Sequence, residues 1–225
     1  TSKTKMIALT HMSNVLGTVQ PIKNIVDIAH SNGIPVLIDG TQGAVHDRIN
    51  VDEVGVDFYV FTGHKLYAPS GIGVLYAKKE RQKDMTPFQG GGEMIAEVTK
   101  DSVTYAQAPQ KFEAGTPPIA QAVGLGHAIK YINDIGLNEI HEHEAKISDY
   151  AKDKLQEIDG LSFFVDPAYS KGIFSFNMDG AHPHDVSTII DRKGIAIRAG
   201  THCAEPLMQS FGVTSTCRAS IAMYN

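Results

Sequence analysis

The stretch FYVFTGHKLYAPSGIGVLYAKK, from Phe58 to Lys79, decides the fold class of this chain. The apolar run 56–61 predicts a buried strand, and a glycine-rich second strand is predicted over 71–77. Between the two strands lies Lys65, next to a histidine. A lysine at a strand end is usually solvated, because ammonium groups are rarely buried unless they are paired. The rest of the sequence has to show whether Lys65 has a chemical role.

Strands and helices alternate on both sides of this stretch. Strands are predicted over 6–10 and 34–38, and a helix over 21–31, which opens with proline and stops at an Asn-Gly pair. Together with the strands 56–61 and 71–77, this order predicts a mostly parallel sheet in an α/β layer fold.

The second half of the chain has a different pattern. Long helices are predicted over 120–135 and 137–158, followed by shorter segments: strands 161–165 and 172–178, a helix 184–193, and strands 195–198 and 217–223. This order predicts a smaller α+β domain. Because Thr116-Pro117-Pro118 breaks the pattern, the joint is expected near residues 117–130, with domains of 1–125 and 126–225.

Composition excludes several classes of protein. The 225 residues are 42% hydrophobic and 20% charged, which is enough to bury a sizeable core. A formal net charge of -5 argues against a nucleic-acid partner. No apolar stretch approaches the roughly 18 residues of a membrane span, and the N-terminal apolar segment is too short for a signal peptide, so the expected compartment is the cytoplasm.

The ends of the chain and its two cysteines add further expectations. The sequence has no initiator methionine, and its last predicted strand has nothing after it, so we expect it to be part of a longer polypeptide. Cys203 and Cys217 are too few for a disulfide framework and cannot form a zinc quartet, so no metal site is expected. Cys217 begins a predicted strand and is expected in the core.

Asp39 and Lys65 are the first candidate site residues. Each lies at or just after the carboxyl end of a predicted strand, where ligands bind in open α/β sheets. A lysine amine and a carboxylate suit a pyridine aldehyde cofactor, because the amine forms a Schiff base and the carboxylate keeps the ring nitrogen protonated. A structural ion pair, or an Asp-Gly turn, would explain the same residues.

Glycine-containing loops supply candidates for the other parts of such a site. Phosphate groups bind backbone N–H groups and hydroxyls, which are offered by 62–64, by 90–92 and by 115–116. Near the carboxyl end, RAGTHC brings together Arg198, His202 and Cys203, with Arg218 further on. An arginine is the preferred partner of a carboxylate, and a thiol beside Arg and His is favoured as the thiolate. The glycine loops would also suit a flexible segment, and Cys203 an unremarkable small side chain.

Two histidine-rich segments are interpreted as background. HEHE, 141–144, falls in a predicted helix and is expected on a solvated face, because neighbours two apart do not face each other. The segment 182–185 opens a helix, where His or Asp is an ordinary cap.

The sequence closely resembles SUF-type (group II) cysteine desulfurases in seven segments. In chain order these are THMSNVLGT, VLIDGTQ, DFYVFTGHKLYAPSGIGVLY, GGGEMI, KFEAGTP, RAGTHCAEPLM and CRASIAMYN. Such desulfurases are pyridoxal phosphate (PLP) enzymes of the class V aminotransferase-like group, with fold type I. The resemblance spans nearly the whole chain, and the pair TGHKLY and RAGTHCAEPLM is its most specific part. It implies a fold type I large domain, present in part, followed by the smaller domain.

The resemblance also implies a role for each matching residue. Lys65 and Cys203 match the Schiff-base lysine and the sulfur-accepting nucleophile. The matching cofactor-binding residues are Asp39 at the pyridine nitrogen, Gln42 at the phenolic oxygen, Thr62 and His64 at the phosphate, and Thr116 at the phosphate of the other subunit of a homodimer. The matching substrate-binding residues are Asn14, Arg198 and Arg218. The family histidine that stacks on the cofactor ring would lie before Thr1.

The implied reaction converts L-cysteine to L-alanine and leaves the sulfur as a persulfide on Cys203. A sulfur-acceptor protein of the SUF pathway is then the implied partner, in iron–sulfur cluster assembly. A selenocysteine lyase or another fold type I PLP enzyme would keep Lys65 and Asp39 without needing a nucleophile at 203. A cofactor-free scaffold or an inactive fragment is the alternative from a different class.

Overall fold

The computed structural model describes all residues from 1 to 225 and divides them into two compact units. The first unit comprises 1–9, 23–39 and 50–131, and the second comprises 10–22, 40–49 and 132–225. The predicted domain limits of 1–125 and 126–225 stay a prediction. None of the helices has the length and hydropathy needed to cross a membrane.

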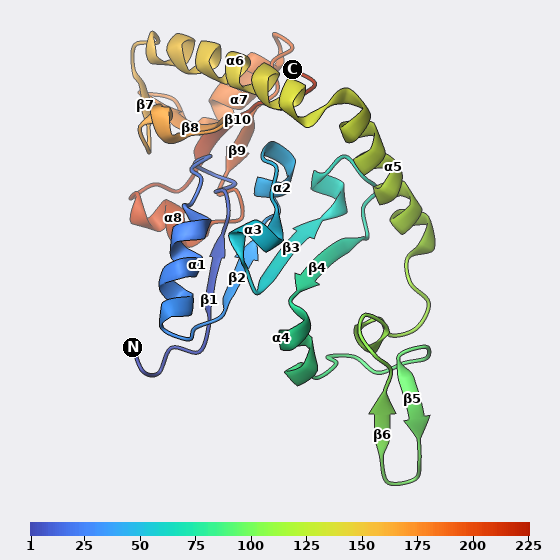
Figure 1. Cartoon of the computed structure of the whole chain (residues 1–225). Helices are drawn as coiled ribbons and strands as arrows, with labels where there is room; N and C mark the ends of the chain where they lie inside the picture. The colour runs from blue at the N-terminus through green and yellow to red at the C-terminus, as the bar shows by residue number, and fades with distance from the viewer. The chain divides into compact units, whose positions relative to one another are not determined.

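The first unit contains a four-stranded sheet in the order β1-β2-β3-β4 (Figure 1). Its strands are β1 (Ile7–Thr10), β2 (Val36–Asp39), β3 (Phe58–Thr62) and β4 (Gly73–Ala77). β2 and β3 are parallel, whereas β3 and β4 are antiparallel because they are joined by a loop too short for a crossover. The chain therefore has an α/β fold with a mixed sheet.

Helices and a hairpin complete this unit. The helices are α1 (Ile22–Ser31), α3 (Val51–Val54), α4 (Lys79–Asp84) and α5 (Ile119–Ile135), with single 3₁₀ turns η1 (Gly63–Lys65) and η2 (Gln110–Phe112). β5 (Ile95–Val98) and β6 (Val103–Tyr105) form a separate antiparallel pair. Val26, Val36, Ile38 and Val56 are all almost fully buried and form part of the core.

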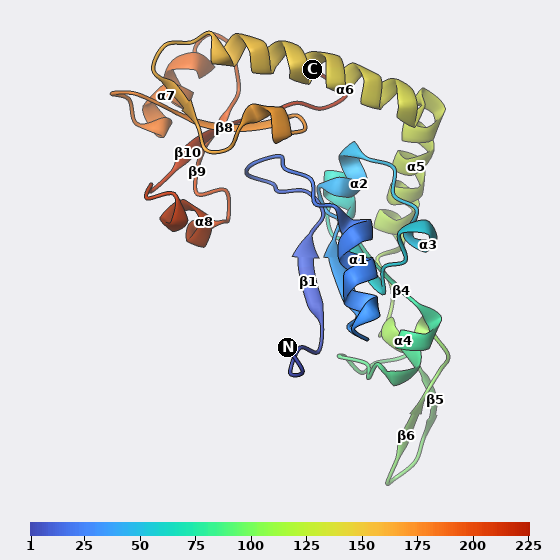
Figure 2. The ribbon, with the colours of Figure 1, turned by 60° about the vertical axis from the view of Figure 1, so that its left-hand side comes forward.

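The second unit is built on an antiparallel sheet in the order β7-β8-β10-β9. Its strands are β7 (Leu161–Phe163), β8 (Ile173–Met178), β9 (Arg198–Gly200) and β10 (Thr216–Ser220). The helices are α2 (Gly43–His46), α6 (Leu137–Gln156), α7 (Pro183–Asp191) and α8 (Glu205–Ser210), with the 3₁₀ turn η3 (Pro167–Tyr169). α7 packs against β8, β9 and β10. α6 lies along the same sheet in Figure 2.

Two local expectations can be compared with the structure. His182 caps α7 as predicted, with its side chain accepting a hydrogen bond from the backbone N–H of His184. The strand predicted over 195–198 instead begins at Arg198. The reason is that the N–H of Ile195 donates to the carbonyl of Ile190, so Gly194 and Ile195 close the end of α7.

Candidate active site

Lys65 lies in a tight turn at the end of β3. The turn η1 is pinned to the start of β4, because the N–H of Gly63 donates to the carbonyl of Ile72 at 2.9 Å. Gly63 is buried, and a Cβ added to it would stand 2.7 Å from the Cγ2 of Ile72. Only glycine fits this turn without movement. Lys65 itself is exposed, so the turn presents an amine at the carboxyl end of the strand.

Asp39 lies at the same edge of this sheet. It is the last residue of β2, which runs parallel to β3 with Asp39 opposite Val60. Thr62 ends β3, and its Oγ1 lies 2.8 Å from Nδ1 of His64. A carboxylate, a hydroxyl, an imidazole and the amine of Lys65 therefore follow the ends of two adjacent strands.

Two of the glycine-rich loops meet in the same unit. The N–H of Gly115 donates to the carbonyl of Gly92 at 3.0 Å, and Gly115 has a left-handed φ of 78°. Thr116 follows it and is exposed. Gln42 belongs to the second unit, where it occupies the N-cap position of α2.

The second unit gathers the other four predicted residues. Arg198 and Arg218 stand directly opposite each other on β9 and β10. Nη2 of Arg198 lies 3.9 Å from the Sγ of Cys203, which is exposed. Nη1 of Arg218 donates to the carbonyl of Asn14 at 2.8 Å. A nucleophilic side chain and two guanidinium groups thus share one surface.

This arrangement is electrostatically unbalanced. Burial, and then the positive charge of Arg198, lower the pKa of Arg218, while Cys203 acts in the opposite direction. Like charges directly opposite each other on neighbouring strands are destabilising. An anion held between the two guanidinium groups would relieve the repulsion, and a carboxylate matches the fork of an arginine.

The motif RAGTHC predicted that His202 would help to favour the thiolate of Cys203, but the structure buries its ring. It is 1% exposed, and its Nε2 lies 3.1 Å from the carbonyl oxygen and 2.9 Å from the Oγ1 of Thr216. Burial, and then the charge of Arg218, lower its pKa to about 4. The motif RAGTHC placed His202 next to Cys203, but only the packing reveals that the ring points into the core.

The two cysteines differ sharply. Cys217 is fully buried, and its Sγ lies 3.4 Å from the carbonyl oxygen of Pro183. Burial raises the pKa of its thiol to about 11. The prediction that Cys217 belongs to the core is confirmed, and the exposed Cys203 is the thiol that can react.

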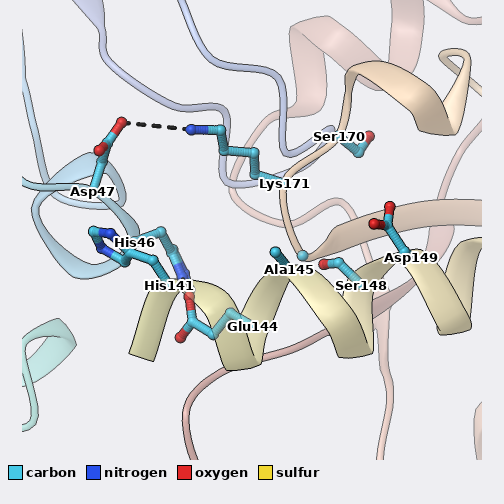
Figure 3. Close-up of a pocket in the computed structure, with 10 residues that line it drawn as sticks. His46, Asp47, His141, Glu144, Ala145, Ser148, Asp149, Ser170 and Lys171 are labelled. Carbon is cyan, nitrogen blue, oxygen red and sulfur yellow. Dashed lines mark hydrogen bonds and ion pairs between the residues drawn. The ribbon is translucent and has the colours of Figure 1, made fainter. Parts of the chain in front are cut away.

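A cavity of about 310 Å³ lies elsewhere in the second unit (Figure 3). His46 and Glu144 line it, with Nδ1 of the histidine 3.0 Å from Oε2 of the carboxylate. Lys171 and Asp47 form an ion pair at 3.5 Å on its other side. The expectation of a solvated HEHE segment was wrong for Glu144, which is 8% exposed because α6 turns it inward toward His46.

The structure contains no group of three or more His, Cys, Asp or Glu residues that could hold a metal ion. The cavity therefore offers a part-buried histidine–carboxylate contact rather than a metal centre.

Comparison with known proteins identifies the family. The family described as Aminotransferase class-V matches residues 1–225. The chain belongs to this family. Among curated relatives, a probable cysteine desulfurase from Halalkalibacterium halodurans is 50% identical over 223 residues, covering 99% of this chain and 55% of that protein. A cysteine desulfurase from Shigella sonnei is 45% identical over 224 residues, covering 99% of this chain and 55% of that protein.

Solved structures of cysteine desulfurases agree with the fold. The cysteine desulfurase CsdA from Escherichia coli, in an S-sulfonic acid form, matches with a TM-score of 0.94 and 42% identity, over 100% of this chain and 56% of that one. The apo cysteine desulfurase from Thermococcus onnurineus NA1 matches with a TM-score of 0.89 and 37% identity, over 98% of this chain and 56% of that one. The chain spans about half the length of the curated relatives it matches.

Proposed function

We propose that the protein is a PLP-dependent cysteine desulfurase, which converts L-cysteine to L-alanine and transfers the sulfur as a persulfide. The observation that carries this proposal is the exposed thiol of Cys203 beside the opposed pair Arg198 and Arg218, in a chain of the class-V family. A soft nucleophile next to a carboxylate-binding pair is what sulfur removal from an amino acid requires.

The residues at the edge of the first sheet fit the cofactor. Lys65 supplies an exposed amine for the aldehyde, and Asp39 supplies a carboxylate for the pyridine nitrogen. The hydroxyl of Thr62 and the ring of His64, 2.8 Å apart, supply hydrogen-bonding groups for the phosphate. Gln42 is assigned to the phenolic oxygen on the resemblance alone. When bound, PLP withdraws electrons from the α-carbon of the attached amino acid and so weakens its bonds.

Residues of the second unit then act on the substrate. Arg218, with Arg198 nearby, holds the carboxylate of cysteine, and Asn14 braces Arg218 through its backbone carbonyl. The thiolate of Cys203 attacks the substrate sulfur, so that an S–S bond forms as the C–S bond breaks. The electron pair of the broken bond stays with the substrate carbon, which takes up a proton and becomes the methyl group of alanine. Lys65, once free, is the amine placed to move the α-proton.

Further parts of the proposal concern the whole protein. The chain would contribute part of a fold type I large domain and a smaller α+β domain. Thr116, exposed after the left-handed Gly115, is the residue proposed to reach the phosphate held by the other subunit of a homodimer. The persulfide would pass to a sulfur-acceptor protein of the SUF pathway, for iron–sulfur cluster assembly.

The test compares Cys203→Ala with Lys65→Ala. We expect the purified protein to show the visible absorbance of bound PLP and to release alanine from cysteine. Cys203→Ala should keep the absorbance and lose alanine release, whereas Lys65→Ala should lose covalent fixation of the cofactor by borohydride. Full alanine release by Cys203→Ala would contradict a thiol acceptor and favour another fold type I enzyme. Absence of bound cofactor in the unaltered protein would contradict the proposal altogether.

A further inference from the structure

The segment that carries Cys203 has an unusual backbone. His202 has a φ of 55° and Cys203 a φ of 60°, so two consecutive residues other than glycine are left-handed. Such a conformation costs free energy for any residue with a Cβ, and it persists only where the surroundings impose it. Cys203 is exposed, and its side chain has one polar contact, the long one to Arg198. A backbone hydrogen bond of 3.0 Å from the N–H of Ala204 to the carbonyl of Thr201 closes the turn around these two residues. The side-chain restraint on the turn comes from His202.

Three contacts hold His202 in place. Its backbone carbonyl accepts a hydrogen bond of 2.9 Å from Nδ2 of Asn14. Its Nε2 lies within hydrogen-bond distance of both the carbonyl oxygen and the Oγ1 of Thr216, the first residue of β10. The ring and the backbone of His202 are thus attached to two different segments of the second unit.

The contacts of the ring also define where its proton is. A carbonyl oxygen can only accept a hydrogen bond, so Nε2 must carry the hydrogen. Because burial and Arg218 lower the pKa of His202 to about 4, the ring is neutral near pH 7. Nδ1 is then an unprotonated nitrogen, and it is buried without a partner. An unpartnered buried nitrogen costs free energy, so stability alone does not explain a histidine here.

We propose that His202 is a positioning residue for Cys203, whose Nε2–H bond to Thr216 clamps the left-handed turn that presents the thiol. This inference rests on the proposed function, because it assigns the clamp to sulfur acceptance. Arg198 and Arg218 lie on β9 and β10, the two strands on either side of the turn. The clamp therefore fixes the thiol relative to the carboxylate-binding pair.

Two substitutions of His202 distinguish the effect of the Nε2–H hydrogen bond from the effect of the side chain on packing and backbone strain. The terminal amide of glutamine reaches the place of Nε2, whereas the shorter amide of asparagine reaches only that of Nδ1. Asparagine tolerates the left-handed region better than glutamine does. If backbone strain determined kcat for alanine formation, His202→Asn would have the higher kcat of the two variants. If the Nε2–H bond determines it, His202→Gln will have the higher kcat.

We expect His202→Gln to keep kcat for alanine formation within about threefold of the unaltered protein. His202→Asn should lower kcat about ten- to hundredfold, as misplacement of a reacting group does, with KM for cysteine and the absorbance of bound cofactor unchanged. Equal kcat values in both variants would overturn the proposal. So would a loss of bound cofactor that parallels the loss of kcat, because it would indicate a purely structural role.

A second measurement needs neither turnover nor a folded variant. In the unaltered protein labelled with ¹⁵N-histidine, the ring of His202 should be neutral at pH 7, with its proton on Nε2. A proton on Nδ1, or a charged ring, would overturn the proposal. If the unaltered protein formed no alanine while this tautomer was found, the proposed function would fail, and only the contact of the His202 ring with Thr216 would stand.

Discussion

Replacement of Asp57 by alanine should destabilise the first unit strongly. The carboxylate is 2% exposed, and its Oδ2 accepts hydrogen bonds of 2.8 Å from the backbone N–H of Val36 and from Nε2 of His30. Its Oδ1 accepts a third, also of 2.8 Å, from Nε of Arg81. One side chain thus joins α1, β2 and α4 at the base of the strands that lead to Asp39 and Lys65.

The size of the effect follows from what each partner loses. The N–H of Val36 would remain buried without an acceptor, which costs about 1–3 kcal/mol. His30 and Arg81 are 34% and 40% exposed and can turn toward water, so their losses are smaller. Breaking a buried charged network typically costs about 3–5 kcal/mol, and we expect Asp57→Ala to lie near the lower end, at about 3 kcal/mol.

Urea unfolding at pH 7, followed by circular dichroism, measures this loss. The matched control is Asp27→Ala on α1, whose exposed ion pair with Lys23 is worth no more than about 0.5 kcal/mol. Amide exchange in β2 and β3 should locate the loss in the first unit. If the loss in Asp57→Ala lay within about 1 kcal/mol of that in the control, the carboxylate of Asp57 would not stabilise the contacts among α1, β2 and α4.

The pH dependence gives an independent check. Burial alone would raise the pKa of Asp57, but the hydrogen bonds from His30, Val36 and Arg81 together outweigh it and lower the pKa below its ordinary value. A lowered folded pKa means that the stabilisation is complete above the unfolded value and is lost as the pH falls through the folded one. The difference between the unaltered protein and Asp57→Ala should therefore shrink in acid below pH 3.8.

Three further predictions concern the site. Gly63→Ala should reduce the cofactor bound per chain severalfold, because its Cβ meets Ile72 at 2.7 Å, whereas Gly90→Ala, with open space around its Cβ, should not. As the pH falls from 6.5 to about 4, His202 becomes protonated in the unfolded chain but stays neutral in the folded protein. About 3 kcal/mol of the free energy of unfolding should therefore be lost over that range. Urea unfolding of His202→Gln should lack this pH dependence, and an identical dependence would contradict it. Cys217 should resist iodoacetamide at pH 8 in the folded protein, since burial raises its pKa to about 11, and mass spectrometry of its peptide should find no label until urea is added.

Much of the fold could be predicted from the sequence, because its long elements carry strong patterns. The apolar runs over β2 and β3 and the helical spacing of α5 and α6 identify these elements to within a few residues. The short helices α2, α3, α4 and α8 have four to six residues each, too few to establish a period. The hairpin β5–β6 was also not predicted, because most of its residues are exposed and lack an apolar face.

The sequence predicts candidate site residues but not their geometry. Residue types offered Lys65 and Cys203 as candidates, and the family resemblance assigned their roles, whereas the opposition of Arg198 and Arg218 depends on the register of β9 and β10. The inward ring of His202 depends on a left-handed turn that its residue type only permits. Local propensity does not specify such non-local pairings.

In the proposed reaction Cys203 accepts the sulfur of cysteine. Mass spectrometry of the peptide that carries Cys203, after brief exposure of the cofactor-loaded protein to L-cysteine and trapping with iodoacetamide, detects this transfer. We expect one extra sulfur atom on Cys203 and none on Cys217. Alanine release with no added sulfur on Cys203 would contradict it.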